Sequence, residues 1–167
     1  MIRKLSVLIL ALSLLFVLTG CGGSAATGEK TETKTVTVTD AAGRTVTLKQ
    51  PIKSYAISTF DLIDFIIPLK GEEAFAMLKG VGDSGGKESY DKIYEAKFPQ
   101  YKDQWKIISP HNAPFDAEAI LTARPDVLIV NSAMQGHLHA MDIESKLTDA
   151  GIALLLIDVP GTGGQSP

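Results

Sequence analysis

The sequence predicts an α/β fold in which a parallel β-sheet is flanked by helices and preceded by an antiparallel β-hairpin. Residues 35–39 and 44–48 alternate polar and apolar side chains around the segment Asp40-Ala41-Ala42-Gly43, a pattern typical of a hairpin with its turn. After Pro51, short runs rich in Ile, Leu and Val alternate with helical stretches. Strands that are apolar on both faces and are separated by helices indicate a parallel, Rossmann-like sheet covered on both sides.

Five strands and four helices are expected after the hairpin. The expected strands are 54–58, 76–82, 105–109, 126–131 and 152–159. The expected helices are 60–69, interrupted near Pro68, then about 89–98, 116–124 and about 140–150. Asp116 is a suitable N-cap for the third helix, and Pro125 ends it. Gly151 offers a left-handed residue after the last helix.

The first twenty residues are predicted to be a lipoprotein signal peptide. Arg3 and Lys4 precede the apolar run Leu5–Leu18, which is shorter than the roughly 20 residues that span a bilayer. The run leads into Leu18-Thr19-Gly20-Cys21, which resembles a lipobox. Cys21 is therefore expected to become the acylated first residue and to hold the chain on the lipid bilayer. An ordinary signal peptide or a core helix is the alternative interpretation.

Composition limits what the mature chain does. Residues 21–35 are small and polar and are expected to form a flexible tether, leaving 36–167 as one domain. Without residues 1–20 the chain has 14 basic and 19 acidic side chains, which argues against a nucleic-acid partner. Cys21 is the single cysteine, so no disulfide and no cysteine metal site is expected.

Three stretches resemble bacterial solute-binding lipoproteins that serve ABC importers of ferric siderophores, haem and cobalamin. They are TVTVTDAAGRTVTL (35–48), FDAEAILTARPDVLIV (115–130) and KLTDAGIALLLI (146–157), in the order found in that family. The resemblance implies two α/β lobes that grip a ligand between them. This chain matches the N-terminal lobe, so the chain is expected to be truncated, with the second lobe absent.

The family resemblance also implies the site. Ligand contacts are expected from loops at the carboxyl ends of the strands, as in open α/β sheets generally. The expected lining residues are Thr59, Phe60, Ser84, His111, Asn112, Ser132 and Gln135; the alternative for each is a loop residue facing water. Glu118 is expected to dock onto an arginine of the membrane permease. Its alternative role is a favourable contact with the helix dipole.

Two further motifs have weaker interpretations. His137 and His139 form a His-x-His pair that suits a metal or haem iron, but solvated histidines are the favoured reading because no third ligand stands at a recognisable spacing. Gly82-Asp83-Ser84-Gly85-Gly86 spells the GDSGG of trypsin-like proteases, yet all three histidines follow the serine, which is the wrong order for that family. The stretch also fails as a phosphate-binding loop. These glycines are instead expected to allow a sharp turn.

The predicted function is therefore non-covalent capture of an iron-siderophore, haem or corrinoid and its delivery to ABC permease subunits. The protein is expected to face the periplasm or the extracellular side, anchored by its lipid, with no cofactor of its own. The alternative is a one-lobe surface lipoprotein with a scaffold or weak scavenging role. An enzyme is not expected, because no nucleophile-base-orienter set or carboxylate pair follows the strands.

Overall fold

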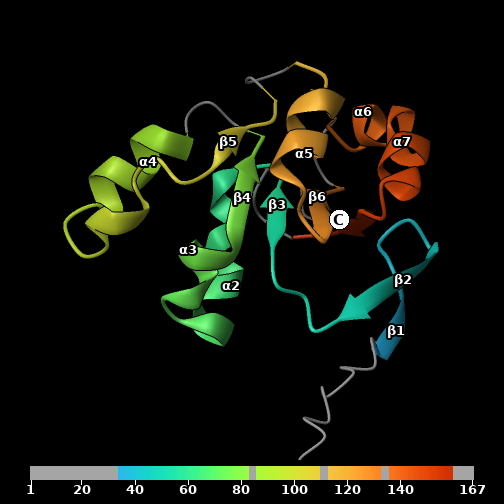
Figure 1. Cartoon of the computed structure of the whole chain (residues 1–167), viewed down its shortest axis with the longest axis horizontal. Coiled ribbons are helices and arrows are strands. Elements are labelled where there is room, and N and C mark those ends of the chain that lie inside the picture. The colour runs from blue at the N-terminus through green and yellow to red at the C-terminus, as the bar shows by residue number, and fades with distance from the viewer. Residues whose placement is uncertain (1–33, 83–85, 110–112, 133–135, 160–167) are drawn as a thin grey trace, which may run out of the picture. The chain divides into compact units, whose positions relative to one another are not determined.

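Five parallel strands form the central sheet of the protein (Figure 1). The computed structural model describes residues 34–82, 86–109, 113–132 and 136–159, which belong to one compact unit. The strands are β3 (Tyr55–Ile57), β4 (Leu78–Val81), β5 (Lys106–Ile107), β6 (Val127–Asn131) and β7 (Ala153–Ile157). Their order is β5-β4-β3-β6-β7, and every neighbouring pair is parallel. The predicted parallel α/β fold is thus confirmed.

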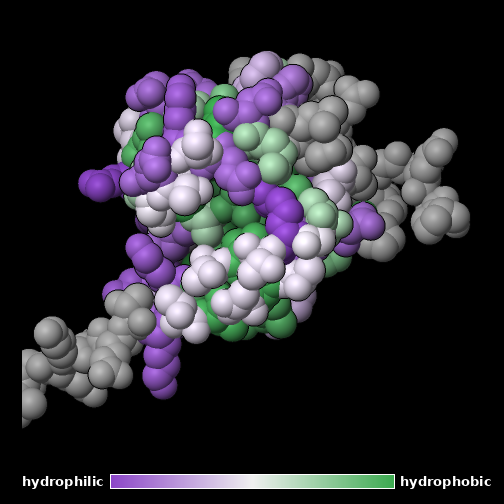
Figure 2. Space-filling model, turned by 90° about the vertical axis from the view of Figure 1, so that its right-hand side faces the viewer, coloured by the Kyte–Doolittle hydropathy of each residue, from purple (hydrophilic) through white to green (hydrophobic). Residues whose placement is uncertain are grey.

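The predicted hairpin is also confirmed. Strands β1 (Lys34–Thr39) and β2 (Thr45–Gln50) pair antiparallel, with Val36 opposite Leu48 and Val38 opposite Val46. The threonines of both strands face solvent, whereas Leu48 is buried against the sheet. Period-two alternation therefore gives the hairpin one face that packs and one that is solvated. In the view of Figure 2, hydrophobic residues are visible between hydrophilic ones on this side of the molecule.

Helices cover the sheet on both faces. The helical elements are η1 (Phe60–Leu62), α2 (Ile63–Lys70), α3 (Glu73–Met77), α4 (Gly86–Ile93), η2 (Pro99–Tyr101), α5 (Ala117–Ala123), α6 (Gly136–Asp142) and α7 (Glu144–Asp149). One core joins α2, α3 and α4 and the hairpin to one face of the sheet, with Ile57, Phe75 and Tyr90 fully buried. The other core joins α5, α6 and α7 to the opposite face, around Ile120 and Leu128.

The helix boundaries differ from the sequence prediction in several places. The helix expected over about 89–98 is α4, which begins at Gly86 and ends at Ile93. Helix α2 continues through Pro68 and ends at Lys70, before Gly71 at φ 58°. The helix tolerates Pro68 because, so near the helix end, a proline removes a single backbone hydrogen bond. At the other end of the helix, the buried side chain of Ile63 holds the first turn in place. Residues 76–77 belong to helix α3 rather than to a strand, because a short apolar run does not distinguish the two. The last helix is divided into α6 and α7 around Ile143.

Within the ranges that the structure describes, no helix combines the length and the apolar character needed to cross a membrane. The predicted signal peptide and tether, with Cys21, lie outside those ranges.

Candidate functional site

The order of the strands places a switch point between β3 and β6. From β3 the chain moves outward through β4 and β5, and it then returns to the other side of β3 for β6 and β7. Loops that leave β3 and β6 at their carboxyl ends consequently diverge to opposite faces of the sheet. In open α/β sheets the crevice between such loops is where ligands bind. We refer to the residues that follow the five strands at this edge as the carboxyl rim.

Ser58 and Asn131 tie the two strands together at the switch point. The backbone N–H of Ser58 donates to the carbonyl of Ile129 at 2.9 Å, and the N–H of Asn131 donates to the Ser58 Oγ at 3.0 Å. Asn131 is fully buried. An amide and a hydroxyl at the ends of two apolar strands thus supply the polar groups at the base of the rim.

Gly82 allows β4 to end close to Ser58. Its N–H donates to the carbonyl of Ile57 at 2.8 Å. A Cβ atom at this position would lie 2.3 Å from the carbonyl oxygen of Ser58, a backbone atom that cannot move aside. Glycine is therefore required at residue 82 by the close approach of two backbones, in addition to the sharp turn expected from the sequence.

The remaining strands complete the rim with small polar residues and a carboxylate. After β5, the Ser109 hydroxyl donates to the carbonyl of Ala113 at 2.7 Å, which closes the segment leading to α5. After β6, the Ser132 N–H donates to the carbonyl of Ile157 in β7 at 2.7 Å. Asp158 follows β7 and is exposed.

The structure places three of the seven predicted lining residues. Thr59 and Ser132 are half-buried on the rim, after β3 and β6 respectively. Phe60 also follows β3, but just 3% of its surface is exposed. Ser84, His111, Asn112 and Gln135 lie outside the described residues.

Phe60 belongs to an aromatic cluster beneath the rim. Its ring centroid lies 6.4 Å from that of Tyr90, 6.2 Å from Tyr94 and 5.8 Å from Trp105. Phe75 packs against the same cluster, 5.6 Å from Tyr90. Aromatic pairs at these distances and angles are favourable. In this structure Phe60 is buried within the cluster, and its predicted contact with a ligand remains a prediction.

Glu118 lies in the first turn of α5 and is exposed. The Asp116 side chain caps this helix by accepting from the N–H of Ala119 at 3.0 Å, as the sequence predicts. Arg124 ends it in a left-handed conformation, at φ 49°. Asp116 caps the helix, so Glu118 is not needed for that role. Because the Glu118 side chain is exposed, its carboxylate is accessible to a partner.

Of the His-x-His pair, the structure describes the side chain of His139. His139 lies on α6, with its Nδ1 atom 3.9 Å from a carboxylate oxygen of Asp142. The side chain of His137 lies outside the described residues, as does His111. Within the described ranges, no group of three or more His, Cys, Asp or Glu side chains is arranged to hold a metal ion.

An ion-pair network joins the hairpin to the sheet and to α7. The Arg44 guanidinium donates to the Asp40 carboxylate at 2.6 and 2.8 Å and to Glu144 at 2.5 Å. Asp40 also accepts from the N–H groups of Ala42 and Arg44. We call Asp40, Arg44 and Glu144 the hairpin latch. Burial raises the pKa of Asp40, but hydrogen bonds and the charge of Arg44 outweigh this and leave the pKa below its ordinary value.

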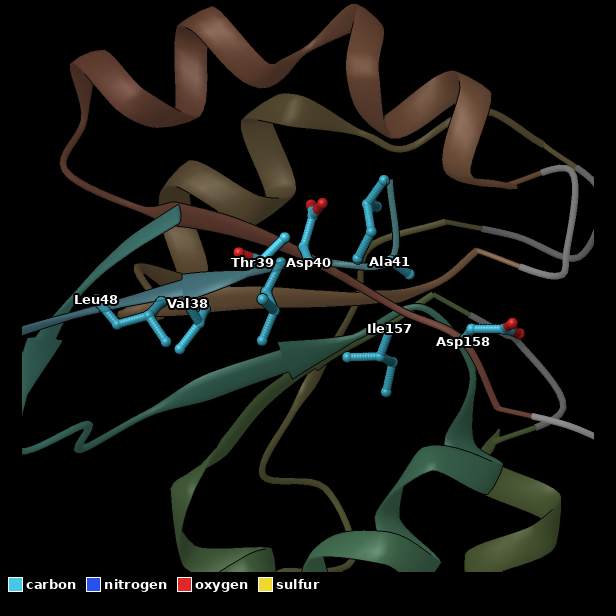
Figure 3. A pocket seen from close by; sticks show the side chains of 9 residues that line it. Val38, Thr39, Asp40, Ala41, Leu48, Ile157 and Asp158 are labelled. Carbon is cyan, nitrogen blue, oxygen red and sulfur yellow. The ribbon is translucent and has the colours of Figure 1, made fainter. Parts of the chain in front are cut away.

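A shallow hollow of about 500 Å³ lies between the hairpin and β7 (Figure 3). Apolar side chains including Val38, Leu48 and Ile157 line most of it. Of the residues that line the hollow, Asp158 is the one that belongs to the carboxyl rim. The hollow therefore does not coincide with the switch point, where the polar groups converge.

Sequence reasoning missed Ser58, Gly82 and Asn131 as determinants of the rim. A polar residue at the end of an apolar strand, such as Asn131 at the end of DVLIVN, could have indicated a rim residue. The sequence cannot show, however, which other strand lies beside that residue.

No protein-family model matches the sequence, and neither does any curated protein. Solved structures do match. A periplasmic solute-binding protein from Veillonella parvula is similar with a TM-score of 0.62 and 21% identity, over 75% of this chain and 36% of that one. The molybdate-binding periplasmic protein MolA of a Haemophilus influenzae ABC transporter is similar with a TM-score of 0.55 and 20% identity, over 74% and 34%.

These comparisons define the fold. The chain has the fold of one lobe of a periplasmic solute-binding protein, and it spans about a third of the length of the structures it matches. The structures named above are transport-associated binding proteins rather than enzymes.

Proposed function

We propose that this chain is the N-terminal lobe of a lipid-anchored solute-binding protein that captures a metal chelate for an ABC importer. The switch point between β3 and β6, in a fold shared with periplasmic solute-binding proteins, carries the proposal. The rim there offers the hydroxyl groups of Ser58, Thr59 and Ser132, next to the aromatic cluster that contains Phe60. Polar groups over a rigid support suit a large ligand held without covalent chemistry. A ferric siderophore, haem or corrinoid is the proposed cargo.

Ligand capture is testable by calorimetric titration of the protein with an iron chelate, haem and a corrinoid. We expect saturable binding of at least one of them. Ser132→Trp should weaken that binding by blocking the rim, whereas Thr47→Trp, on the solvent face of the hairpin, should leave it unchanged. Equal effects of the two variants would exclude the carboxyl rim as the ligand site.

Delivery is proposed to use Glu118 as a docking group for a cationic residue of the permease. Glu73 is a matched control, because it is also exposed and also lies in the first turn of a short helix. In reconstituted importer, Glu118→Lys should lower ligand-stimulated ATP hydrolysis and leave ligand affinity unchanged. Glu73→Lys should alter neither. A loss of stimulation in both variants would point to a general charge effect and would contradict docking through Glu118.

The location is proposed to be the outer face of the cytoplasmic membrane, reached through the signal peptide and acylated Cys21. Metabolic labelling with a palmitate analogue should mark the protein, and Cys21→Ser should abolish the label. Incorporation of label into the Cys21→Ser variant would refute this anchor.

The alternative is a one-lobe surface lipoprotein that scavenges weakly or serves as a scaffold. It becomes the better explanation if the intact protein binds none of the three ligands and does not stimulate a permease.

A further inference from the structure

The charges of the carboxyl rim indicate what kind of chelate the lobe accepts. Exposed carboxylates lie on the described part of the rim. Asp61 lies in η1, directly after β3, and Asp158 follows β7; both side chains are exposed. Neither is hydrogen-bonded to, or ion-paired with, another described side chain. The rim therefore presents uncompensated negative charge beside its hydroxyl groups.

No free cation balances these carboxylates in the described part of the rim. Lys87, in the first turn of α4, is the basic residue that follows β4. Its ammonium lies 3.1 Å from Asp103 and 3.6 Å from Asp91, so its charge is already matched by two carboxylates.

The arginines of the folded unit are placed elsewhere. Arg44 is held in the hairpin latch by Asp40 and Glu144. Arg124 ends α5, three residues before β6 begins, and so lies at the opposite edge of the sheet. Bidentate recognition of an anion by a guanidinium, the usual device for carboxylate or phosphate groups, is thus not provided by either side chain at the carboxyl rim.

We infer that the ligand surface that meets this lobe is electrically neutral or cationic, as in a ferric trihydroxamate, rather than anionic, as in a ferric tris-catecholate. The inference rests on the proposed function and narrows its ligand class. Three hydroxamates cancel the charge of ferric iron, whereas three catecholates leave a trianion. A trianion close to Asp61 and Asp158 is repelled, and this repulsion weakens with added salt. A neutral chelate instead uses the rim hydroxyls, and a cationic one gains from the carboxylates.

The test is calorimetric titration of the intact protein with three ferric chelates of similar size. The probes are a cationic trihydroxamate that carries a free ammonium, a neutral cyclic trihydroxamate and a trianionic tris-catecholate. We expect the cationic and neutral chelates to bind at least about 10-fold more tightly than the trianion at low salt. Equal or tighter binding of the trianion would overturn the inference and leave the proposed function standing. Binding of none of the probes would overturn both.

Substitutions then locate the charge effect. Asp158→Asn and Asp61→Asn should each raise affinity for the trianion by about 3- to 10-fold at low salt. The gain should shrink at about 0.5 M salt, where screening is strong. Asp149→Asn is the matched control, because Asp149 is exposed but ends α7 at the opposite edge of the sheet. An identical gain from Asp149→Asn would mean that net charge alone matters and would contradict selection by the rim.

Discussion

Replacing Arg44 by methionine should destabilise the protein strongly, because Arg44 is the one described side chain that pairs with the buried Asp40 carboxylate. The Asp40 side chain is 0% exposed and the Arg44 side chain is 22% exposed. Removing one partner of a buried ion pair costs about 3–5 kcal/mol. Asp40 would keep its two backbone donors, at 3.0 and 2.9 Å, which reduces the loss. We therefore expect the free energy of unfolding to fall by about 2–3 kcal/mol.

The assay is urea unfolding followed by circular dichroism, with Lys92→Met as the matched control. Lys92 and its partner Glu88 are each 70% exposed, so that variant should change the free energy of unfolding by less than about 0.5 kcal/mol. Arg44→Lys should be intermediate, because an ammonium cannot reproduce the paired donors of a guanidinium. A cost for Arg44→Met no greater than that of the control would refute the proposed role of the latch.

The pH dependence of the same variant tests the role of Asp40 separately. The folded state lowers the pKa of Asp40 below its ordinary value of 3.8. The stability that this carboxylate contributes is therefore complete above that value and is lost as pH falls below it. The difference between wild type and Arg44→Met should stay constant from pH 7 to about 5 and shrink below about 4. If the difference in stability between wild type and Arg44→Met were unchanged at pH 3, this would contradict the conclusion that the buried Asp40 carboxylate is ionised in the folded protein.

Three further predictions follow from single contacts. Asp116→Ala should lower the free energy of unfolding by about 1 kcal/mol, with Asp116→Asn close to wild type, because the N-cap of α5 is lost in the first variant alone; equal losses in urea titrations would contradict this. Gly82→Ala should cost about 1–3 kcal/mol, since the new Cβ meets the Ser58 carbonyl oxygen; an unchanged melting temperature would refute the clash. Burial and a hydrogen bond to Asp64 raise the pKa of Tyr94 to about 12, so stability linked to its protonated hydroxyl is complete below pH 10 and is lost as pH rises towards 12. Tyr94→Phe should flatten that alkaline loss in unfolding measurements, and an unaltered slope would show that other groups cause it.

Local patterns were enough to predict the hairpin, the presence of five further strands and the capped helix α5. Each depends on neighbours in the chain: alternation over 35–48, an aspartate at residue 116, and a glycine at residue 151, which has φ 77°. Hydrophobic periodicity and capping act within a few residues, so they can be read before the fold is known. The parallel arrangement also followed, because apolar strands separated by helices have few other ways to bury both faces.

Only the tertiary structure decided how these elements meet. The order β5-β4-β3-β6-β7 makes Ser58 and Asn131 neighbours although they are 73 residues apart. The same packing joins Arg44 to Glu144 across 100 residues and places Phe60 within the aromatic cluster. Such contacts depend on the burial of distant surfaces against each other, for which a single sequence carries no periodic signal. The sequence alone therefore indicated roughly where the strands and their loops lie along the chain, while packing decided which loops share the carboxyl rim and which charges remain there.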